Sequence, residues 1–421
     1  MMRYCFLLFS ILIIGISCSE RERNNPFDPA NTIQTAIQLS IKPYPEKIEL
    51  SWTYPPLEGV QKTLIYRAVD DSNAYILYRE LDGTARTFLD SQIEPFHWYY
   101  YRVTLSNGTR ETSPSNTART FSGPTTTWML SENGFQVLQL SYDLQYTLQS
   151  LNTFYPDHDW HVQLASFSIW LVSRSFAAVS RLSLKAKEET FILTQGLKTP
   201  VAVVGQGETN NFYVLDNGQD KVFFYQEEKP VRTFSLPRGN YLALKVFPIQ
   251  DRLFVINEEK LYIFSLSLNQ IVDSLVAPSG YTFYRMVQQG IYILAIANEY
   301  ESQKAILYWR SSVQNTWHLL QLPFNCGAVA FSPQSNQLVV SKMISSGPQI
   351  YKDNLVKLST SGTRLWELSG FRVITDIQID PETQQIVVAD RLSDHIVRVS
   401  AEGNVAFRSK TLYDPIRVYI Q

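Results

Sequence analysis

The sequence predicts an all-β protein, and three observations support this class. Aromatic residues make up 13% of the 421 residues, with 24 Tyr and 23 Phe, and aromatic side chains favour strands. Short apolar runs that end on a small polar residue recur through the C-terminal two thirds of the chain. Pro, Gly, Asn and Asp separate these runs, as expected of turns. The chain is too long for one ordinary core, so two or more domains are expected.

The recurring run is clearest at Ile386–Asp390, a β-branched stretch that ends on a carboxylate. Seven such runs end on these residues: Ser131, Ser173, Asp216, Asn257, Asn298, Ser341 and Asp390. Successive ends lie 42, 43, 41, 41, 43 and 49 residues apart. A period in the low forties, built from short apolar strands, is typical of a β-propeller with one four-stranded blade per repeat. Residues 124–421 are therefore predicted to form a propeller.

The repeats predict six complete blades and one divided blade. The complete blades are expected at about residues 160–198, 199–239, 240–280, 281–324, 325–370 and 371–410. Three further strands precede them, between residues 128 and 148, and one strand follows them at residues 415–420. Joining these strands makes a seventh blade, closes the ring and pairs edges that would otherwise be exposed. A six-bladed ring with an extra hairpin is the alternative.

Two repeats carry a resemblance to a known family. Residues 386–399 and 212–224 each contain an apolar strand, an Asp, a short polar loop, a basic residue and a second apolar strand. In this pattern they resemble the NHL-repeat group of propellers. The other repeats depart from the pattern, since Asn257 and Asn298 replace Asp and three repeats have Ser. The resemblance therefore supports the superfamily better than the subfamily.

The repeated polar residue has two interpretations. Asp, Asn and Ser side chains accept hydrogen bonds from backbone N–H groups two residues on, which would fix the turn between the second and third strands. Gluconolactonase-like propellers instead bind calcium in the channel, and that resemblance implies Asp216, Asn257, Asn298 and Asp390 as ligands. No obvious catalytic base or Glu ligand accompanies them. We expect the structural role, no catalytic residue, no metal and no cofactor.

Residues 33–121 show alternating short strands, with Ile48, Leu50 and Trp52 on one face of the second. The matching residues are Trp52, Tyr66, the Ile93-x-Pro95-x-x-x-Tyr99 corner and Ser113-Pro114-Ser115. In these features the segment resembles fibronectin type III domains. The resemblance implies a tyrosine corner, in which the Tyr99 hydroxyl bonds to backbone near the preceding turn.

The N-terminus has the features of an export signal. Arg3 precedes an apolar run of about a dozen residues, and the run ends in small residues before Cys18. The ending Ile14-Gly15-Ile16-Ser17-Cys18 resembles a bacterial lipoprotein signal, although leucine is usual where Gly15 stands. The resemblance implies cleavage after residue 17 and lipidation of Cys18, with plain secretion as the alternative. Ser19 after the cysteine favours the outer membrane. Residues 18–32 are polar and Pro-containing, as expected of a tether.

The remaining features are expected to be structural. The formal net charge of −2 predicts no basic face, so nucleic acid is not an expected partner. Three cysteines are too few for a disulfide framework, and Cys326 is expected to be buried. Asp157-His158-Asp159-Trp160-His161 has the composition of a metal site, but we expect a loop between blades there.

The sequence thus predicts an envelope lipoprotein, held at the outer membrane through Cys18, on its periplasmic or its surface side. Its propeller is expected to be a non-catalytic binding or scaffolding module for a protein, peptide or glycan. A calcium-dependent hydrolase of the lactonase type is the alternative, and a structural component without a ligand is a third reading. A binding module should spread aromatic side chains over one rim. An enzyme should gather three or more carboxylate or amide oxygens near the axis.

Overall fold

The computed structural model describes Phe27 and residues 37–131, 135–155, 158–163, 167–206, 210–345 and 351–421. The chain divides into two compact units, Met1–Gly123 and Pro124–Gln421. All described regular elements except one short 3-10 helix, Arg391–Ser393, are strands. The all-β prediction is therefore confirmed. Within the described residues, no helix has the length and apolar character needed to cross a membrane.

The first unit contains two antiparallel sheets. The strands are β1 (Gln38–Tyr44), β2 (Lys47–Thr53), β3 (Lys62–Val69), β4 (Ile76–Asp82), β5 (Thr87–Asp90), β6 (Trp98–Ser106) and β7 (Ala118–Phe121). Their order is β1-β2-β5 in one sheet and β4-β3-β6-β7 in the other. Alternation along β6 buries Tyr99 and Tyr101 and leaves Trp98 and Tyr100 half-buried. The Tyr99 hydroxyl accepts a hydrogen bond from the Glu94 backbone N–H at 2.8 Å, so the expected corner contact is present.

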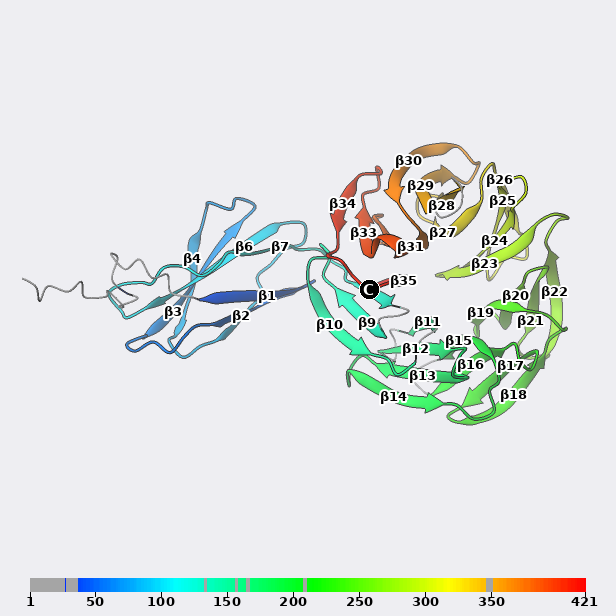
Figure 1. The fold of residues 1–421 in the computed structure, drawn as a ribbon, viewed down its shortest axis with the longest axis horizontal. Helices are drawn as coiled ribbons and strands as arrows, with labels where there is room; N and C mark the ends of the chain where they lie inside the picture. Colours follow the sequence, from blue (N-terminus) through cyan, green and yellow to red (C-terminus); the bar gives the residue numbers. More distant parts are fainter. Residues whose placement is uncertain are drawn as a thin grey trace, which may run out of the picture. The chain divides into compact units, whose positions relative to one another are not determined.

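The second unit is a ring of seven four-stranded antiparallel sheets, a β-propeller (Figure 1). Six sheets follow the chain in order. They are β11–β14 (His158–Gln163, Ser168–Ser173, Ala178–Ser183, Glu188–Leu193), β15–β18 (Pro200–Gln206, Asn211–Asp216, Lys221–Gln226, Lys229–Ser235), β19–β22 (Tyr241–Phe247, Arg252–Asn257, Lys260–Ser265, Gln270–Val276), β23–β26 (Thr282–Gln289, Tyr292–Glu299, Lys304–Ser311, His318–Leu322), β27–β30 (Cys326–Ser332, Gln337–Ser345, Tyr351–Ser359, Arg364–Phe371) and β31–β34 (Ile374–Ile379, Ile386–Asp390, His395–Val399, Val405–Arg408). The seventh sheet joins the two ends of the unit. It contains β35 (Pro415–Ile420), β8 (Thr127–Ser131), β9 (Gln136–Leu140) and β10 (Thr147–Asn152), in that order.

The last strand closes the ring through β8. Register pairs Pro415 with Ser131 and Ile420 with Thr127. Beyond the paired strands, the N–H and C=O groups of Thr126 and Gln421 bond reciprocally, at 2.9 and 3.0 Å. The Trp128 indole N–H donates to the Gln421 side chain at 2.6 Å. The final strand of the chain is thus the inner strand of the first sheet.

The core of the ring lies at the junctions between blades. Seven apolar clusters join neighbouring sheets, one at each junction. At the two junctions of the divided blade, Leu130 packs with Leu171 of the next blade, and Met129 packs with Val387 of the last blade. Burial of one such side chain stabilises the fold by about 1.5–3 kcal/mol. Because successive side chains of a strand point to opposite faces of its sheet, each blade contributes apolar side chains to two junctions.

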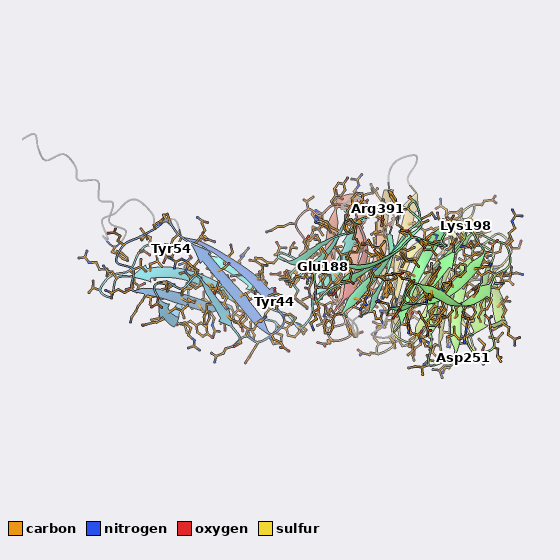
Figure 2. The ribbon with its side chains drawn as sticks, turned by 90° about the horizontal axis from the view of Figure 1, so that it is seen from below. Tyr44, Tyr54, Glu188, Lys198, Asp251 and Arg391 are labelled. Atoms are coloured by element: carbon orange, nitrogen blue, oxygen red, sulfur yellow. The ribbon has the colours of Figure 1, made fainter. Side chains whose placement is uncertain are left out.

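The connections between strands fall on two faces of the ring. Lys198, which precedes β15, and Arg391, which follows β32, lie on one face, whereas Asp251 of the β19–β20 turn lies on the other (Figure 2). In several turns the last residue before the next strand has a left-handed backbone, for example Asp220 with φ of 51° and Asp394 with φ of 56°. Phe135 adopts the same conformation, with φ of 51°, which is rare for a bulky residue.

One prediction from the sequence is wrong. The segment that contains Asp159 and His161 is the strand β11, which pairs with β12 along its whole length, and not a loop between blades. The prediction failed because it took the polar residues to be exposed, whereas Asp159 and His161 are half-buried alternate residues of one strand. Trp160, between them, is buried in the junction with the divided blade.

Candidate functional site

The first strand of each blade belongs to the inner ring. β15, β19, β23, β27, β31 and β35 each contact the first strand of the blade before them. Figure 1 shows β35 and the C-terminus near the middle of the ring. Side chains on these strands that do not enter a junction therefore lie around the axis.

Five charged side chains from five inner strands interact around the axis, and we call them the axial cluster. They are Asp159 of β11, Lys245 of β19, Arg285 of β23, Asp376 of β31 and Arg417 of β35. Three of them occupy equivalent register positions. Each pairs with the residue that comes just before the small polar residue at the end of the neighbouring strand. Arg417 pairs with Leu130, Asp159 with Val172 and Asp376 with Ala389.

A β-bulge precedes several of these positions. The register shifts between Phe283 and Arg285, between Ile374 and Asp376, and between Pro415 and Arg417. A bulge inserts one extra residue and re-aims the side chains that follow it. The bulges therefore help to turn charged side chains away from the apolar junctions and toward the axis.

Arg285 and Asp376 form the tighter pair of the cluster. Arg285 Nη2 donates to Asp376 Oδ1 at 2.8 Å, and Arg285 Nη1 donates to the Thr375 carbonyl. The second carboxylate oxygen of Asp376 accepts from the Val418 N–H at 3.1 Å. Asp376 is therefore engaged on both oxygens and links β23, β31 and β35.

Arg417 and Asp159 form a looser pair. Arg417 Nε lies 3.4 Å from Asp159 Oδ1, and Arg417 Nη1 donates to the Ile416 carbonyl at 3.1 Å. Burial alone would raise the pKa of Asp159, but Arg417 and Lys245 hold it below its usual range. Burial opposes the charge of Arg417 as well, and Asp159 and Asp376 nevertheless raise the pKa of Arg417.

Lys245 and His161 complete the environment of the axis. Burial lowers the pKa of Lys245, and the cations Arg417 and Arg285 lower it further, against the opposing effect of Asp159 and Asp376. Burial and the neighbouring Lys245 lower the pKa of His161 to about 4, so His161 is neutral near pH 7. The cluster thus brings three basic side chains together with two carboxylates.

The axial cluster is enclosed by protein and still reached by solvent. The exposed fractions of the side chains are 29% for Arg417, 24% for Asp159, 15% for Arg285 and 6% for Asp376. Loss of hydration is nevertheless the largest single influence on the pKa of Arg417, Asp159 and Arg285. The charged groups of the axial cluster are therefore partly buried and have lost much of their hydration.

The four calcium-ligand candidates all make backbone hydrogen bonds, although Asp390 Oδ2 is buried without a hydrogen-bond partner among the described residues. Asp216 is fully buried and accepts from the N–H groups of Lys198, Thr199 and Gly218 at 2.7–2.9 Å. Asn257 Oδ1 accepts from the N–H groups two and three residues on, at 3.0 and 2.7 Å. The turn contact expected from the sequence is therefore present at both residues.

Asp390 and Asn298 bond elsewhere. Asp390 Oδ1 accepts from the N–H groups of Arg372 and Val373, which precede the inner strand of the same blade. Asn298 bonds to both backbone groups of Cys326, the first residue of the next blade, at 3.0 and 2.9 Å. Among the described residues, no group of three or more His, Cys, Asp or Glu could hold a metal ion.

Three exposed phenylalanines and one half-buried tyrosine lie on connections of two neighbouring blades, and we call them the aromatic strip. Phe135 follows β8, Phe154 and Tyr155 follow β10, and Phe176 follows β12. The Phe135 carbonyl accepts from the Thr153 N–H at 2.8 Å, and the rings of Tyr155 and Phe176 lie 5.0 Å apart. Phe154 is 69% exposed and Phe176 is 53% exposed. Several exposed aromatics in sequence-distant connections form a surface suited to stacking or apolar contact.

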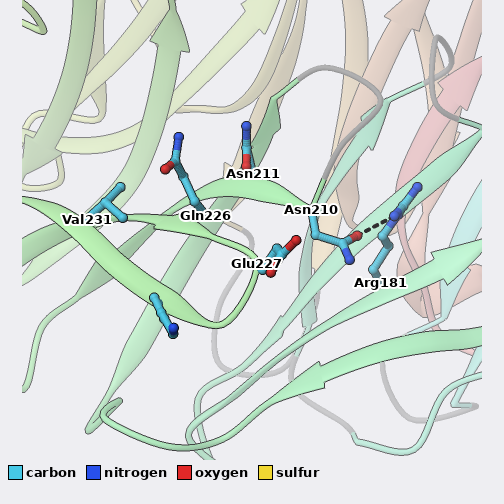
Figure 3. A pocket seen from close by; sticks show the side chains of 7 residues that line it. Arg181, Asn210, Asn211, Gln226, Glu227 and Val231 are labelled. Atoms are coloured by element: carbon cyan, nitrogen blue, oxygen red, sulfur yellow. Dashed lines mark hydrogen bonds between the residues drawn. The ribbon is translucent and has the colours of Figure 1, made fainter.

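A polar groove lies between the blades β11–β14 and β15–β18. Its volume is about 660 Å³, and its lining residues are Arg181, Asn210, Asn211, Gln226, Glu227, Lys229 and Val231 (Figure 3). The Arg181 guanidinium donates to the Asn210 side chain. The groove is open and offers amide and charged groups for hydrogen bonding, without an enclosed reacting centre.

Sequence reasoning missed the axial cluster, although a pattern pointing to it was present. Asp159, Ala202, Ala243 and Asp376 each stand fourteen residues before a polar strand end, at Ser173, Asp216, Asn257 and Asp390. Two carboxylates at the same repeat position of otherwise apolar strands indicate that both side chains point the same way, toward the axis. Cys18 and the rest of residues 1–26 lie outside the described residues.

The fold places the chain among β-propeller proteins. The crystal structure of a functionally unknown protein from Desulfotomaculum acetoxidans DSM 771 is similar at a TM-score of 0.51 and 11% identity, over 70% of this chain and 98% of that chain. The β-propeller domain of Cps50 (Swd1) from Myceliophteria thermophila is similar at 0.48 and 12% identity, over 63% and 92% of the chains. Hydrazine synthase from Kuenenia stuttgartiensis is similar at 0.47 and 12% identity, over 58% and 76%. At this identity the similarity shows the fold alone.

No protein-family model matches the sequence, and no curated protein matches it.

Proposed function

We propose that the protein is a non-catalytic binding module, held at the bacterial outer membrane, whose propeller binds a protein, peptide or glycan. The observation that carries this proposal is the aromatic strip. Phe135, Phe154 and Phe176 are 41%, 69% and 53% exposed, and they come from three different connections. Exposed aromatic rings lose little conformational entropy on binding and contribute strongly to partner recognition.

The carboxylates of the ring favour binding over catalysis. Asp216 and Asp390 accept hydrogen bonds from backbone N–H groups, and Asp159 and Asp376 are paired with guanidinium groups. A general base must present a free oxygen to its substrate, and a calcium ion requires six to eight oxygen ligands. Asp216 and Asp376 use both of their oxygens within the ring, and the remaining oxygen of Asp390, Oδ2, is buried.

The membrane anchor of the proposal is a lipid on Cys18, with residues 18–32 as tether. Incorporation of a clickable fatty acid in growing bacteria tests it. Wild-type protein should carry the label and sediment with membranes, whereas Cys18→Ser should lose both properties. A labelled Cys18→Ser variant would contradict this assignment.

The proposal also assigns the first unit to the fibronectin type III fold and the ring to the NHL-like propellers. The strand order β1-β2-β5 and β4-β3-β6-β7, together with the contact between Tyr99 and Glu94, supports the first assignment. Asp216 and Asp390 at the ends of β16 and β32 support the second. In such an arrangement the first unit is a spacer between membrane and ring.

Peptide and glycan arrays probed with the intact chain in mild detergent test the binding function. Ligands should be bound without turnover, and Phe154→Ala with Phe176→Ala should weaken binding at least about tenfold. Phe96→Ala, which removes an exposed phenylalanine of the first unit, is the matched control and should bind as wild type. Equal binding by all three proteins would rule out the aromatic strip. Turnover of an array ligand would overturn the non-catalytic role.

A further inference from the structure

Asparagine followed by glycine is the dipeptide at which a side-chain amide reacts most readily with its own backbone. The next backbone nitrogen lies within reach of the asparagine carbon Cγ, and glycine, which has no Cβ, leaves that nitrogen unhindered. Three such pairs occur in the chain, at residues 107–108, 133–134 and 217–218. The structure describes the first and the third pair, and residues 133–134 lie outside the described residues. The two described pairs differ in the contacts that hold them.

Asn107 lies in an exposed turn of the first unit, directly after β6. Residues 108–110 are exposed, and Asn107 itself is half-buried. A backbone hydrogen bond closes the turn, from the Asn107 N–H to the Arg110 carbonyl at 3.1 Å. The Gly108 backbone has φ of 91°, a conformation that glycine adopts without strain. Solvent therefore reaches the peptide bond between Asn107 and Gly108.

The hydrogen bonds of the Asn107 side chain favour attack on its carbonyl carbon. Asn107 Oδ1 accepts from the Thr109 N–H at 3.1 Å, from the Thr109 hydroxyl at 3.0 Å and from the Arg110 N–H at 2.9 Å. Because these donors lie two and three residues on, the side chain is folded over the peptide bond to Gly108. They also stabilise the negative charge that develops on Oδ1 when a nucleophile adds to Cγ. Among the residues that the structure describes, Asn107 Nδ2 donates no hydrogen bond, so no protein contact retains it as a leaving group.

Asn217, in the propeller, is held in a different way. Its Nδ2 donates to the Asn240 side chain at 3.1 Å and to the Tyr241 carbonyl at 2.9 Å. Its Oδ1 accepts from the Tyr241 N–H at 3.1 Å. The Gly218 N–H donates to the buried Asp216 carboxylate at 2.9 Å. Both the attacking and the leaving nitrogen are thus engaged, and reaction at this pair requires that the contact between the two blades opens first.

We propose that Asn107 is a site of spontaneous modification, which deamidates when the Gly108 backbone nitrogen attacks Asn107 Cγ. The new N–C bond forms as the Gly108 N–H, which donates to the Ser106 hydroxyl at 3.1 Å, gives its proton to solvent. The bond from Cγ to Nδ2 then breaks, and Nδ2 takes up a proton and leaves as ammonia. A five-membered succinimide remains, and water opens it at either carbonyl to give aspartate or isoaspartate at position 107. The step consumes one water and needs no oxidant or cofactor.

The modification changes both the charge and the geometry of the turn. Either product adds one negative charge to a chain whose formal net charge is −2. Isoaspartate also inserts one methylene group into the backbone between Asn107 and Gly108. The hydrogen bond from the Asn107 N–H to the Arg110 carbonyl depends on the present length of this turn and should be lost. The first unit therefore changes with the age of the molecule, whereas the pair in the propeller keeps its amide.

Incubation of the intact chain in mild detergent at mildly alkaline pH, followed by tryptic digestion and mass spectrometry, tests the proposal. Trypsin places the three Asn-Gly pairs on separate peptides, residues 103–110, 120–174 and 199–221. Deamidation at residue 107 should be at least about tenfold faster than at residue 217, which serves as the control within the same chain. In water labelled with heavy oxygen, the label should enter at position 107, and isoaspartate should be found there. Equal rates at the two pairs of the folded chain, or no reaction at residue 107, would overturn the proposal.

Two further measurements show whether the fold causes the difference. In urea, where the contacts of Asn217 are lost, the two pairs should react at similar rates, and a difference that persists there would contradict a structural cause. Thr109→Val removes one donor to Asn107 Oδ1 and should slow the reaction at residue 107 at least about twofold. Thr84→Val is the matched control, because the Thr84 hydroxyl donates to Asp82 in another exposed turn of the same unit. This control should deamidate as wild type, and equal slowing in both variants would overturn the role of the Thr109 hydroxyl.

Discussion

Arg398 Nη1 lies 3.2 Å from Asp380 Oδ2, and both side chains are fully buried. Asp380 Oδ2 also accepts from the Thr125 hydroxyl at 2.8 Å, and Arg398 Nη2 donates to the Thr127 hydroxyl at 3.2 Å. The ion pair belongs to the blade β31–β34, whereas the two threonines belong to the divided blade. This polar contact therefore joins the two blades between which the ring closes.

Removal of one partner of this pair should destabilise the propeller strongly. Arg398→Met leaves Asp380 as a buried charge without its counter-ion, and such a change costs about 3–5 kcal/mol. Urea denaturation followed by tryptophan fluorescence measures the loss. Arg364→Met is the control, because Arg364 pairs with Glu367 at the surface and should cost no more than about 1 kcal/mol. Similar losses in both variants would contradict the structural role of the buried pair.

Asp216 should stabilise the turn and bind no calcium. Asp216→Ala removes a fully buried acceptor from the part-buried N–H groups of Lys198 and Thr199, at about 1 kcal/mol for each lost hydrogen bond. The melting temperature of wild type and variant, after chelator treatment, should not respond to added calcium. A calcium site would stabilise the native state by about 2.7 kcal/mol at a hundredfold excess over its dissociation constant. Such a shift in the wild type, lost in Asp216→Ala, would favour the calcium-dependent hydrolase.

Asp353 should make the stability depend on pH. Burial, with a contribution from Asp390, raises the pKa of Asp353 to about 6, although its carboxylate accepts from the Ile374 N–H. The folded protein thus holds this proton more tightly than the unfolded chain, whose carboxyl titrates near pH 4. The resulting stabilisation is fully present below about pH 4 and is lost as the pH rises through about 6, with a loss of roughly 3 kcal/mol.

The Asp353→Asn variant tests this dependence. The amide stays neutral and keeps an oxygen for the Ile374 N–H, so the variant should be more stable than wild type near pH 7. The advantage should disappear at about pH 4, where Asp353 is protonated in both states. Urea denaturation across this range measures the difference. Glu301→Gln, at an exposed carboxyl, should show no such trend. A constant difference between Asp353→Asn and wild type would refute the assignment.

Deletion of residues 415–421 should open the ring. The deletion exposes the edge of β8 and removes Ile416 and Val418 from two junctions. The propeller should then lose its cooperative unfolding transition. A synthetic peptide of residues 413–421 should restore the transition in a concentration-dependent way, because it can pair with β8. Deletion without effect on unfolding would show that the ring does not need its closing strand.

The ends of three strands were predictable from the sequence, because the residues next to them determine where the strand stops. Asp216, Asn257 and Asp390 end β16, β20 and β32, as the β-branched runs before them indicate. The corresponding strands β24 and β28 continue to Glu299 and Ser345, past their polar residues. Asn298 and Ser341 are therefore inside paired strands, where pairing with the third strand outweighs the local preference for a turn.

The axial cluster was not predictable from local pattern. Lys245 and Arg285 are single charged residues within apolar strands. In the local hydrophobic pattern, each of them only interrupts an apolar run. Their proximity to Arg417 depends on closure of the whole ring. The polar sequence around Asp159 indicated a loop because local reasoning assumes that charged residues face bulk solvent. In this ring Asp159 instead lies on an inner strand and is paired with Arg417.

The pairing of Thr127 with Ile420 also determines the order of events during synthesis. The ribosome synthesises β8, the second strand of the divided blade, long before β35, its inner partner. One edge of β8 therefore stays unpaired while the other blades are synthesised. Contacts between such distant residues form slowly, since closing a long loop is entropically costly. The nascent chain therefore cannot complete its ring before residues 415–420 have emerged.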